Sequence, residues 1–147
     1  MLVGVGTARM ATQSFSMTMS ANRARVEIAR QMVSIAREMI RDYQAGSEGN
    51  YEAILLFQEF MTVRLTQVDV SGARVAEMDM ADDGTIWAVV YMDRATAARE
   101  IIAAQAQAAL AVPAMASFNA EARMNEVFAR INAQERQNAL TRTDWNL

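Results

Sequence analysis

The sequence of 147 residues is 52% hydrophobic and carries a net charge of −3, which fits one folded domain and offers no basic surface for nucleic acid. It contains neither cysteine nor histidine, so disulfides, thiolate or imidazole metal centres and a histidine-based catalytic triad are excluded. No segment has the pattern of a signal peptide, and the longest apolar run, residues 86–92, is too short to span a bilayer.

The first predicted elements are a strand and a long helix. The segment LVGVG, residues 2–6, is short and apolar, which predicts a buried strand. A helix is predicted from about Thr12 and is expected to end at Gly46. Residues 14–20 alternate polar and apolar with period two, so a strand is the alternative there. One predicted apolar stripe comprises Ala21, Ala24, Ile28, Met32, Ile35, Met39 and Tyr43. A second comprises Phe15, Met19, Val26, Val33 and Ile40.

The middle of the chain predicts a loop, a short helix and three strands. Residues 46–50 read as a loop in which Asn50 caps a short helix over YEAILLFQEF. MTVRLT, residues 61–66, alternates apolar and polar side chains and predicts a strand, interrupted at Ser71 and Gly72. ARVAEMDM and TIWAVVYM predict two more strands. The DDG before the second predicts a hairpin, because Gly84 supplies the positive φ of a tight turn.

The carboxy-terminal third is predicted to be helical. After Asp93 the chain is rich in alanine, a strong helix former, and the helix breaks at Pro113 and resumes at about Asn119. The element order predicts an α+β, two-layer sandwich, in which an antiparallel sheet of about four strands packs on the long helix, with carboxy-terminal helices in addition. We expect a single domain over 1–147, with a core at 1–112 and a helical extension at 113–147.

Candidate chemical sites are few. GVGTAR lacks the third glycine of a dinucleotide-binding loop and the Gly-Lys-Ser/Thr of a phosphate-binding loop. Asp79, Asp82 and Asp83 do not have the spacing of a calcium-binding EF-hand loop, so a solvated hairpin tip is expected. The sequence therefore predicts no catalytic residue, no cofactor and no metal site. The helical glutamates are expected to form surface ion pairs rather than an acid–base pair.

Several segments together resemble a known family. GVGTA, the helix with ARVEIARQM, VSG before a strand and DDGTIWAVVYM resemble, in that order, the LPP-twenty family of small bacterial outer-membrane lipoproteins. The amino-terminal domain of flagellar assembly protein T is similar more distantly. The resemblance implies an exported cell-envelope protein, outer-membrane-associated or periplasmic, without established catalytic activity. This chain has neither the signal peptide nor the lipid-bearing cysteine of that pattern. Either a leader was removed, or the gene start is misplaced, or this member is not a lipoprotein. The start directly at the first strand favours a removed leader, and we then expect membrane attachment only through a lipid anchor that this chain lacks.

The strand at 86–92 suggests where a partner binds. Trp87 and Tyr91 lie on the opposite side of this strand from Ile86, Ala88, Val90 and Met92, so both of its faces are apolar. The second face must be covered, either by the helices after Pro113 or by a second copy of the protein. The candidate interaction surface comprises Trp87, Tyr91, Met124, Val127, Phe128 and Ile131.

Three functions from different classes follow. The first is a non-catalytic interaction or structural module of the cell envelope, with a protein partner or self-association. The second is a carrier of a small apolar ligand, using a groove lined by methionine and aromatic side chains. The third, a hydrolase built on carboxylates, would require an Asp or Glu with a raised pKa in a cleft.

Overall fold

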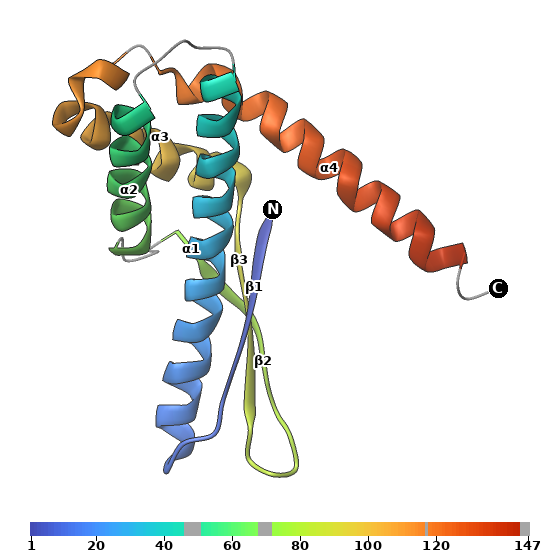
Figure 1. Cartoon of the computed structure of the whole chain (residues 1–147). Helices are drawn as coiled ribbons and strands as arrows, with labels where there is room; N and C mark the ends of the chain where they lie inside the picture. The colour runs from blue at the N-terminus through green and yellow to red at the C-terminus, as the bar shows by residue number, and fades with distance from the viewer. Residues whose placement is uncertain (46–50, 68–71, 117, 145–147) are drawn as a thin grey trace.

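The computed structural model describes residues 1–45, 51–67, 72–116 and 118–144. Over these residues it forms three strands and four α-helices, which confirms the α+β class and the sheet packed on a long helix (Figure 1). The elements are β1 (Leu2–Ala8), α1 (Gln13–Ala45), α2 (Tyr51–Gln67), β2 (Arg74–Met80), β3 (Ile86–Met92), α3 (Arg94–Ala111), the 3-10 turn η1 (Pro113–Met115) and α4 (Ala120–Asp144).

The sheet has the strand order β1-β3-β2, and β3 pairs antiparallel with both neighbours. Val5 lies opposite Val89 on one side of β3, and Glu77 lies opposite Val89 on the other. A bulge between Val75 and Glu77 interrupts the β2 ladder. The described residues therefore supply one strand fewer than the four that the sequence predicted.

The tip of the predicted hairpin is confirmed. Gly84 has φ +88°, the positive value that a tight turn requires. The Ala81 amide donates to the Thr85 carbonyl (2.8 Å), and the Gly84 amide donates to the Ala81 carbonyl (3.0 Å). Asp83 Oδ1 also accepts from the Thr85 amide (2.9 Å). These bonds hold β2 and β3 in register.

α1 begins where the sequence predicted, and the strand alternative for residues 14–20 is wrong. Thr12 Oγ1 accepts a hydrogen bond from the Phe15 amide (3.1 Å), as an N-cap side chain does. The first apolar stripe is confirmed: its members are buried except Tyr43, which is partly buried. The second stripe is only half right, because Phe15 and Val26 are about half exposed. The expected end at Gly46 lies outside the described residues.

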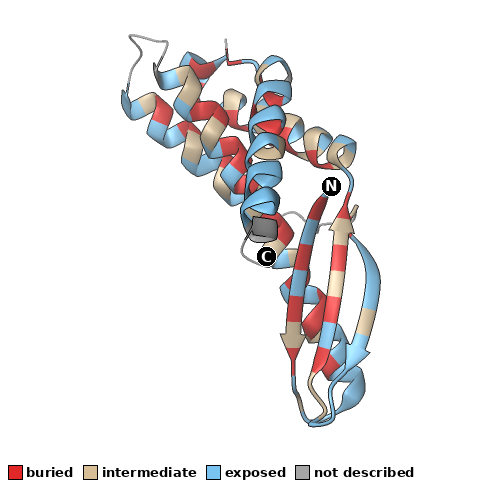
Figure 2. Ribbon diagram, turned by 90° about the vertical axis from the view of Figure 1, so that its right-hand side faces the viewer, coloured by how far each residue is buried: buried red, intermediate tan, exposed pale blue. Residues whose placement is uncertain are grey.

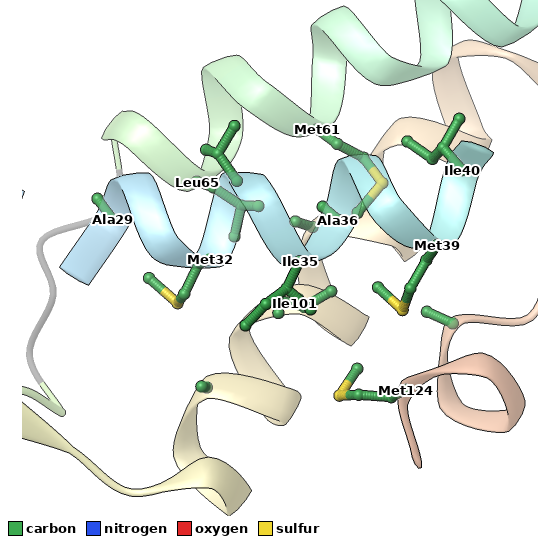
Figure 3. Close-up of a cluster of buried hydrophobic side chains, with 14 of the residues drawn as sticks. Ala29, Met32, Ile35, Ala36, Met39, Ile40, Met61, Leu65, Ile101 and Met124 are labelled. Carbon is green, nitrogen blue, oxygen red and sulfur yellow. The ribbon is translucent and has the colours of Figure 1, made fainter. Parts of the chain in front are cut away.

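The length of α1 explains why the core has two parts. A helix of 33 residues is about 50 Å long, whereas a strand of seven residues spans only about 23 Å. The first half of α1 packs on the sheet, and the second half extends beyond it. That second half is covered by α2, α3 and α4, which surround it with buried side chains (Figure 3). The cluster includes Met32, Ile35, Ala36, Met39, Ile40, Met61, Leu65, Ile101 and Met124.

The predicted strand at residues 61–66 is wrong, because these residues continue α2 to Gln67. The buried side chains of α2 are Ile54, Phe57, Met61 and Leu65, spaced by three or four residues as on one face of a helix. Val63, which shared the predicted strand face with Met61 and Leu65, is exposed. The predictions for residues 46–50 and for Ser71 lie outside the described residues.

The carboxy-terminal helices form where the sequence predicted. Asp93 caps α3 by accepting from the Thr96 amide (2.7 Å), and α4 begins at Ala120 after the break at Pro113. The Gln105 side chain of α3 donates to the Phe118 carbonyl (2.7 Å) and accepts from the Ala120 amide (3.1 Å), so it fixes the start of α4. Within the described residues, no helix combines the length and apolarity needed to cross a membrane.

Candidate interaction surface

The sheet has one covered face and one open face. α1 covers the face that carries Leu2, Ala88 and Val90. The opposite side, here called the outer face, is turned toward the viewer in Figure 2, with α1 behind the sheet. Its members are Val3, Val5 and Thr7 of β1, Trp87, Val89 and Tyr91 of β3, and Arg74, Glu77 and Asp79 of β2.

Apolar side chains of the outer face gather on β1 and β3. Val3 is 42% exposed, Val5 is 49% exposed and Trp87 is 50% exposed, while Val89 and Tyr91 are half-buried. The register pairs Val3 with Tyr91 and Val5 with Val89, so these side chains are adjacent across the strands. Adjacent exposed apolar side chains form a continuous patch, which is a feature of interaction sites.

The third strand borders this patch with charge. Arg74 lies opposite Tyr91, Glu77 opposite Val89 and Asp79 opposite Trp87. All three β2 side chains are exposed. The outer face is therefore apolar on β1 and β3 and charged along β2, an arrangement of apolar centre and polar rim common to protein interfaces.

Two side chains of α1 donate hydrogen bonds to the backbone of the edge strand β1. Arg23 Nη1 donates to the Thr7 carbonyl (2.6 Å), and Gln31 Nε2 donates to the Val3 carbonyl (2.6 Å). Because two backbone acceptors of β1 already have side-chain donors, addition of a strand at this edge is less favourable.

The six predicted surface residues do not form one surface. Trp87 and Tyr91 lie on the outer face as expected from strand alternation. Met124, Val127 and Phe128 are buried in the core of this chain, and Ile131 is partly buried beside them. One of our two expectations was that the helices after Pro113 cover the Trp87 face. The structure shows that they do not.

α4 packs on other helices because polar contacts and apolar contacts both hold it there. Arg130 forms ion pairs with Asp42 and, at 3.9 Å, with Glu38 of α1. The Arg94 guanidinium of α3 lies over the Phe128 ring, 5.3 Å from its centroid. Beyond these contacts α4 projects away from the rest of the chain, on the side of the outer face (Figure 1).

A second apolar stripe on α2 was not predicted. Leu56, Phe60 and Val63 are each more than 40% exposed and recur at four and three residues, so they share one side of the helix opposite the buried one. The sequence did contain a signal, because both sides of this helix are rich in apolar residues. We missed it because we predicted a short helix followed by a strand for these residues.

The clefts of the described residues are open and mixed in character. A cleft of about 440 Å³ between β1, α1, α3 and α4 includes Val3, Ile35, Arg94 and Glu135 in its lining. The carrier hypothesis requires a methionine-lined groove, but Met32, Met39, Met61 and Met124 are buried in the core and do not line one. The long methionine side chains fill irregular space between helices instead.

The carboxylates near the hairpin serve the turn. Asp79 Oδ1 accepts from the Met80 amide (2.8 Å), and Arg9 lies 3.9 Å from Asp83. The hydrogen bonds from Thr85 lower the pKa of Asp83, and those from Thr96 lower the pKa of Asp93. A general acid requires a raised pKa, so these two groups have the opposite property. Among the described residues, no cluster of three or more acidic side chains is placed to hold a metal ion.

Comparison with known proteins finds no family whose sequence pattern matches this chain and no curated protein with significant similarity.

Proposed function

We propose that this protein is a non-catalytic interaction module of the bacterial cell envelope, which binds protein through the outer face of its sheet. The observation that carries the proposal is the half exposure of Trp87, which lies opposite Thr7 and next to Val89 on the face that also exposes Val3 and Val5. Trp87, Val3 and Val5 together leave on the order of 250 Å² of side-chain surface in water, worth roughly 6 kcal/mol if a partner removed it. Tryptophan is also the residue type that most often anchors protein interfaces.

The cell-envelope part of the proposal rests on the resemblance to LPP-twenty lipoproteins. Two of the segments that carry it, GVGTA and DDGTIWAVVYM, lie in β1 and in the hairpin with β3, which are neighbours in the sheet. A third, ARVEIARQM, lies in the part of α1 that contacts β1. These three segments belong to one contiguous part of the structure, as expected of a shared domain core, whereas VSG lies mostly outside the described residues.

A carrier of small apolar ligands has less support. Ligand sites are mostly apolar concavities that enclose their ligand. The cleft beside Val3 and Ile35 is bordered by Arg94 and Glu135, and the methionines that suggested a groove are packed in the core. The outer face, in contrast, presents apolar side chains directly to solvent.

The proposal is tested by placing a photoreactive amino acid at position 87 and illuminating the cells that produce the protein. We expect a discrete protein adduct from position 87, because a partner covers that side chain. The matched control carries the same amino acid at position 110, since Leu110 is an exposed apolar residue at the end of α3, away from the sheet. No adduct at position 87, or the same adducts from both positions, would reject the outer face as the binding surface.

Localisation is tested separately from binding. Fractionation of the same cells should place the protein with the envelope, and the coding sequence before Met1 should encode a hydrophobic leader that ends in a small residue and cysteine. A cytosolic protein whose gene encodes no such leader would reject the envelope assignment without touching the interaction surface.

A further inference from the structure

We infer that the occupant of the outer face is a second copy of this chain, stacked sheet against sheet about a two-fold axis that lies between the sheets and runs across the strands. This inference rests on the proposed function, because it uses the same face and names the partner.

The edges of the sheet are poorer sites for self-association than the face. Arg23 and Gln31 donate to two backbone carbonyls of the edge strand β1, those of Thr7 and Val3. The β2 edge has a bulge between Val75 and Glu77, and a bulge disrupts the regular ladder that an added strand needs. One face of the sheet is already covered by α1. The outer face is what remains.

A two-fold axis across the strands, at the level of the paired Val5 and Val89, brings like strands together in opposite directions. Val5 then lies over the partner's Val5, and Val89 lies over the partner's Val89. Trp87 and Tyr91 are two residues to either side of Val89, so each Trp87 meets the partner's Tyr91. The apolar strands β1 and β3 cover each other, and aromatic pairs form on both sides of the axis.

The charges of β2 distinguish this axis from its alternative. The axis places Arg74 over the partner's Asp79 twice, because Arg74 is level with Tyr91 and Asp79 is level with Trp87. A two-fold axis along the strands would instead place β2 over the partner's β1. The charged side chains of β2 would then lose water against the valines of β1, which costs free energy. Glu77 is level with Val89, so the favoured axis also brings two Glu77 carboxylates together. This repulsion is specific to the proposed arrangement.

The size of the face sets the strength of the association. Three strands of seven residues cover about 23 Å by 14 Å, which is below the size of most stable interfaces. We therefore expect a dimer with a dissociation constant in the micromolar range. The α2 stripe of Leu56, Phe60 and Val63, flanked by the exposed Glu59 and Arg64, is the competing surface on this chain, and a variant of Phe60 tests it directly.

The test is sedimentation velocity and light scattering on the purified full-length chain, from about 1 to 500 µM, a range that brackets such affinities. Arg74→Glu and Asp79→Arg should each weaken the dimer about tenfold, because each reverses both symmetric ion pairs. The dissociation constant of the double variant should return to within about threefold of the wild-type value, since the double variant restores both pairs in the opposite sense.

Glu77→Gln should strengthen the dimer, and Trp87→Glu should abolish it. Circular dichroism melts establish that each variant is folded. We expect all of them to fold, because the substituted positions are exposed.

Three results would overturn the inference: a wild-type chain that stays monomeric, a dimer that is indifferent to the charge variants, or a dimer that is lost on Phe60→Glu. A monomeric chain whose position 87 still forms an adduct with a different protein would remove self-association and leave the proposed function standing. A dimer of purified chains with the predicted charge pattern, together with no adduct at position 87 in cells, would leave the pairing in solution standing and reject its role in the cell.

Discussion

Two glycines set how closely the first strand lies against the long helix. A Cβ atom on Gly4 would lie 2.1 Å from the Ala24 carbonyl oxygen, and one on Gly6 would lie 2.1 Å from the Ser20 carbonyl oxygen. Both obstacles are backbone atoms of α1, which cannot move without moving the helix. The residues that face them on α1 are Ser20 and Ala24, whose small side chains allow the contact. The two glycines that first suggested a phosphate-binding loop therefore have a packing role.

The first prediction concerns this contact. Gly6→Ala should lower the free energy of unfolding by about 3 kcal/mol, because overpacking against backbone forces the strand and helix apart. Val5→Ala, on the exposed side of the same strand, should cost less than about 1 kcal/mol. Urea denaturation of both variants measures the difference. Equal midpoints would show that β1 and α1 are not in backbone contact.

The second prediction concerns the hairpin. Gly84 has nothing within 4 Å of the position where a Cβ would stand, so substitution costs backbone strain and not a clash. Gly84→Val should destabilise by about 1–3 kcal/mol, because a β-branched residue tolerates positive φ poorly. Gly84→Asn should cost less, since asparagine adopts positive φ more readily. A thermal melt in which valine and asparagine behave alike would contradict the assigned turn.

At the scale of elements, the error on α2 shows what local pattern cannot decide. In residues 61–66 the apolar side chains alternate with threonine and arginine, and alternation is the signature of a half-buried strand. Met61 and Leu65 are also four residues apart, which is the spacing of one face of a helix. The segment forms a helix because the second half of α1 extends past the sheet and needs a helix to cover it. The length of α1 was predictable, but what it packs against depends on distant parts of the chain. β1, α1 and the hairpin were predictable because their signals are local.

The third prediction tests the buried face of α1. Ile28→Asp should remove at least about 3 kcal/mol of stability, because Ile28 is fully buried and the new carboxylate has no partner there. Arg30→Ala should change the free energy of unfolding by no more than about 0.5 kcal/mol, since its ion pair with Glu27 is solvent-exposed. If chemical denaturation finds the two variants equally stable, the helix packs through another face.

The fourth prediction concerns pH and the cap of α3. Hydrogen bonds from Thr96 lower the pKa of Asp93 in the folded state, so the cap stabilises the protein above the unfolded-state pKa near 3.8. This stabilisation is lost as the pH falls through the lower, folded-state pKa. Asp93→Asn keeps a capping oxygen and does not titrate. The advantage of wild type over Asp93→Asn should therefore be largest near pH 7 and should shrink as the pH falls below about 4. A difference that is constant between pH 7 and pH 2.5 would argue against a charged cap.

At the scale of the whole molecule, the chain leaves the outer face of its sheet without a cover of its own. The sequence correctly predicted which side chains of β3 lie there, because strand alternation is a local property. It did not predict that Met124, Val127 and Phe128 would be buried against α1 and α3. An apolar stripe on a helix indicates that this side of the helix is covered, but it does not identify the element that covers it. The α2 stripe was missed for a related reason. A helix that is apolar on two sides has no single apolar face, so its pattern does not show which side is buried.

Association of two copies of this chain should cover the Trp87 side chain with protein. Trp145→Phe leaves Trp87 as the one tryptophan of the chain, so its fluorescence reports on the outer face alone. In dilute solution Trp87 should be readily quenched by acrylamide, because half of its surface is in water. At concentrations of about 100 µM, well above a micromolar dissociation constant, quenching should fall and the emission should shift to shorter wavelength. Quenching of Trp87 that is the same at every concentration would contradict the pairing of two outer faces.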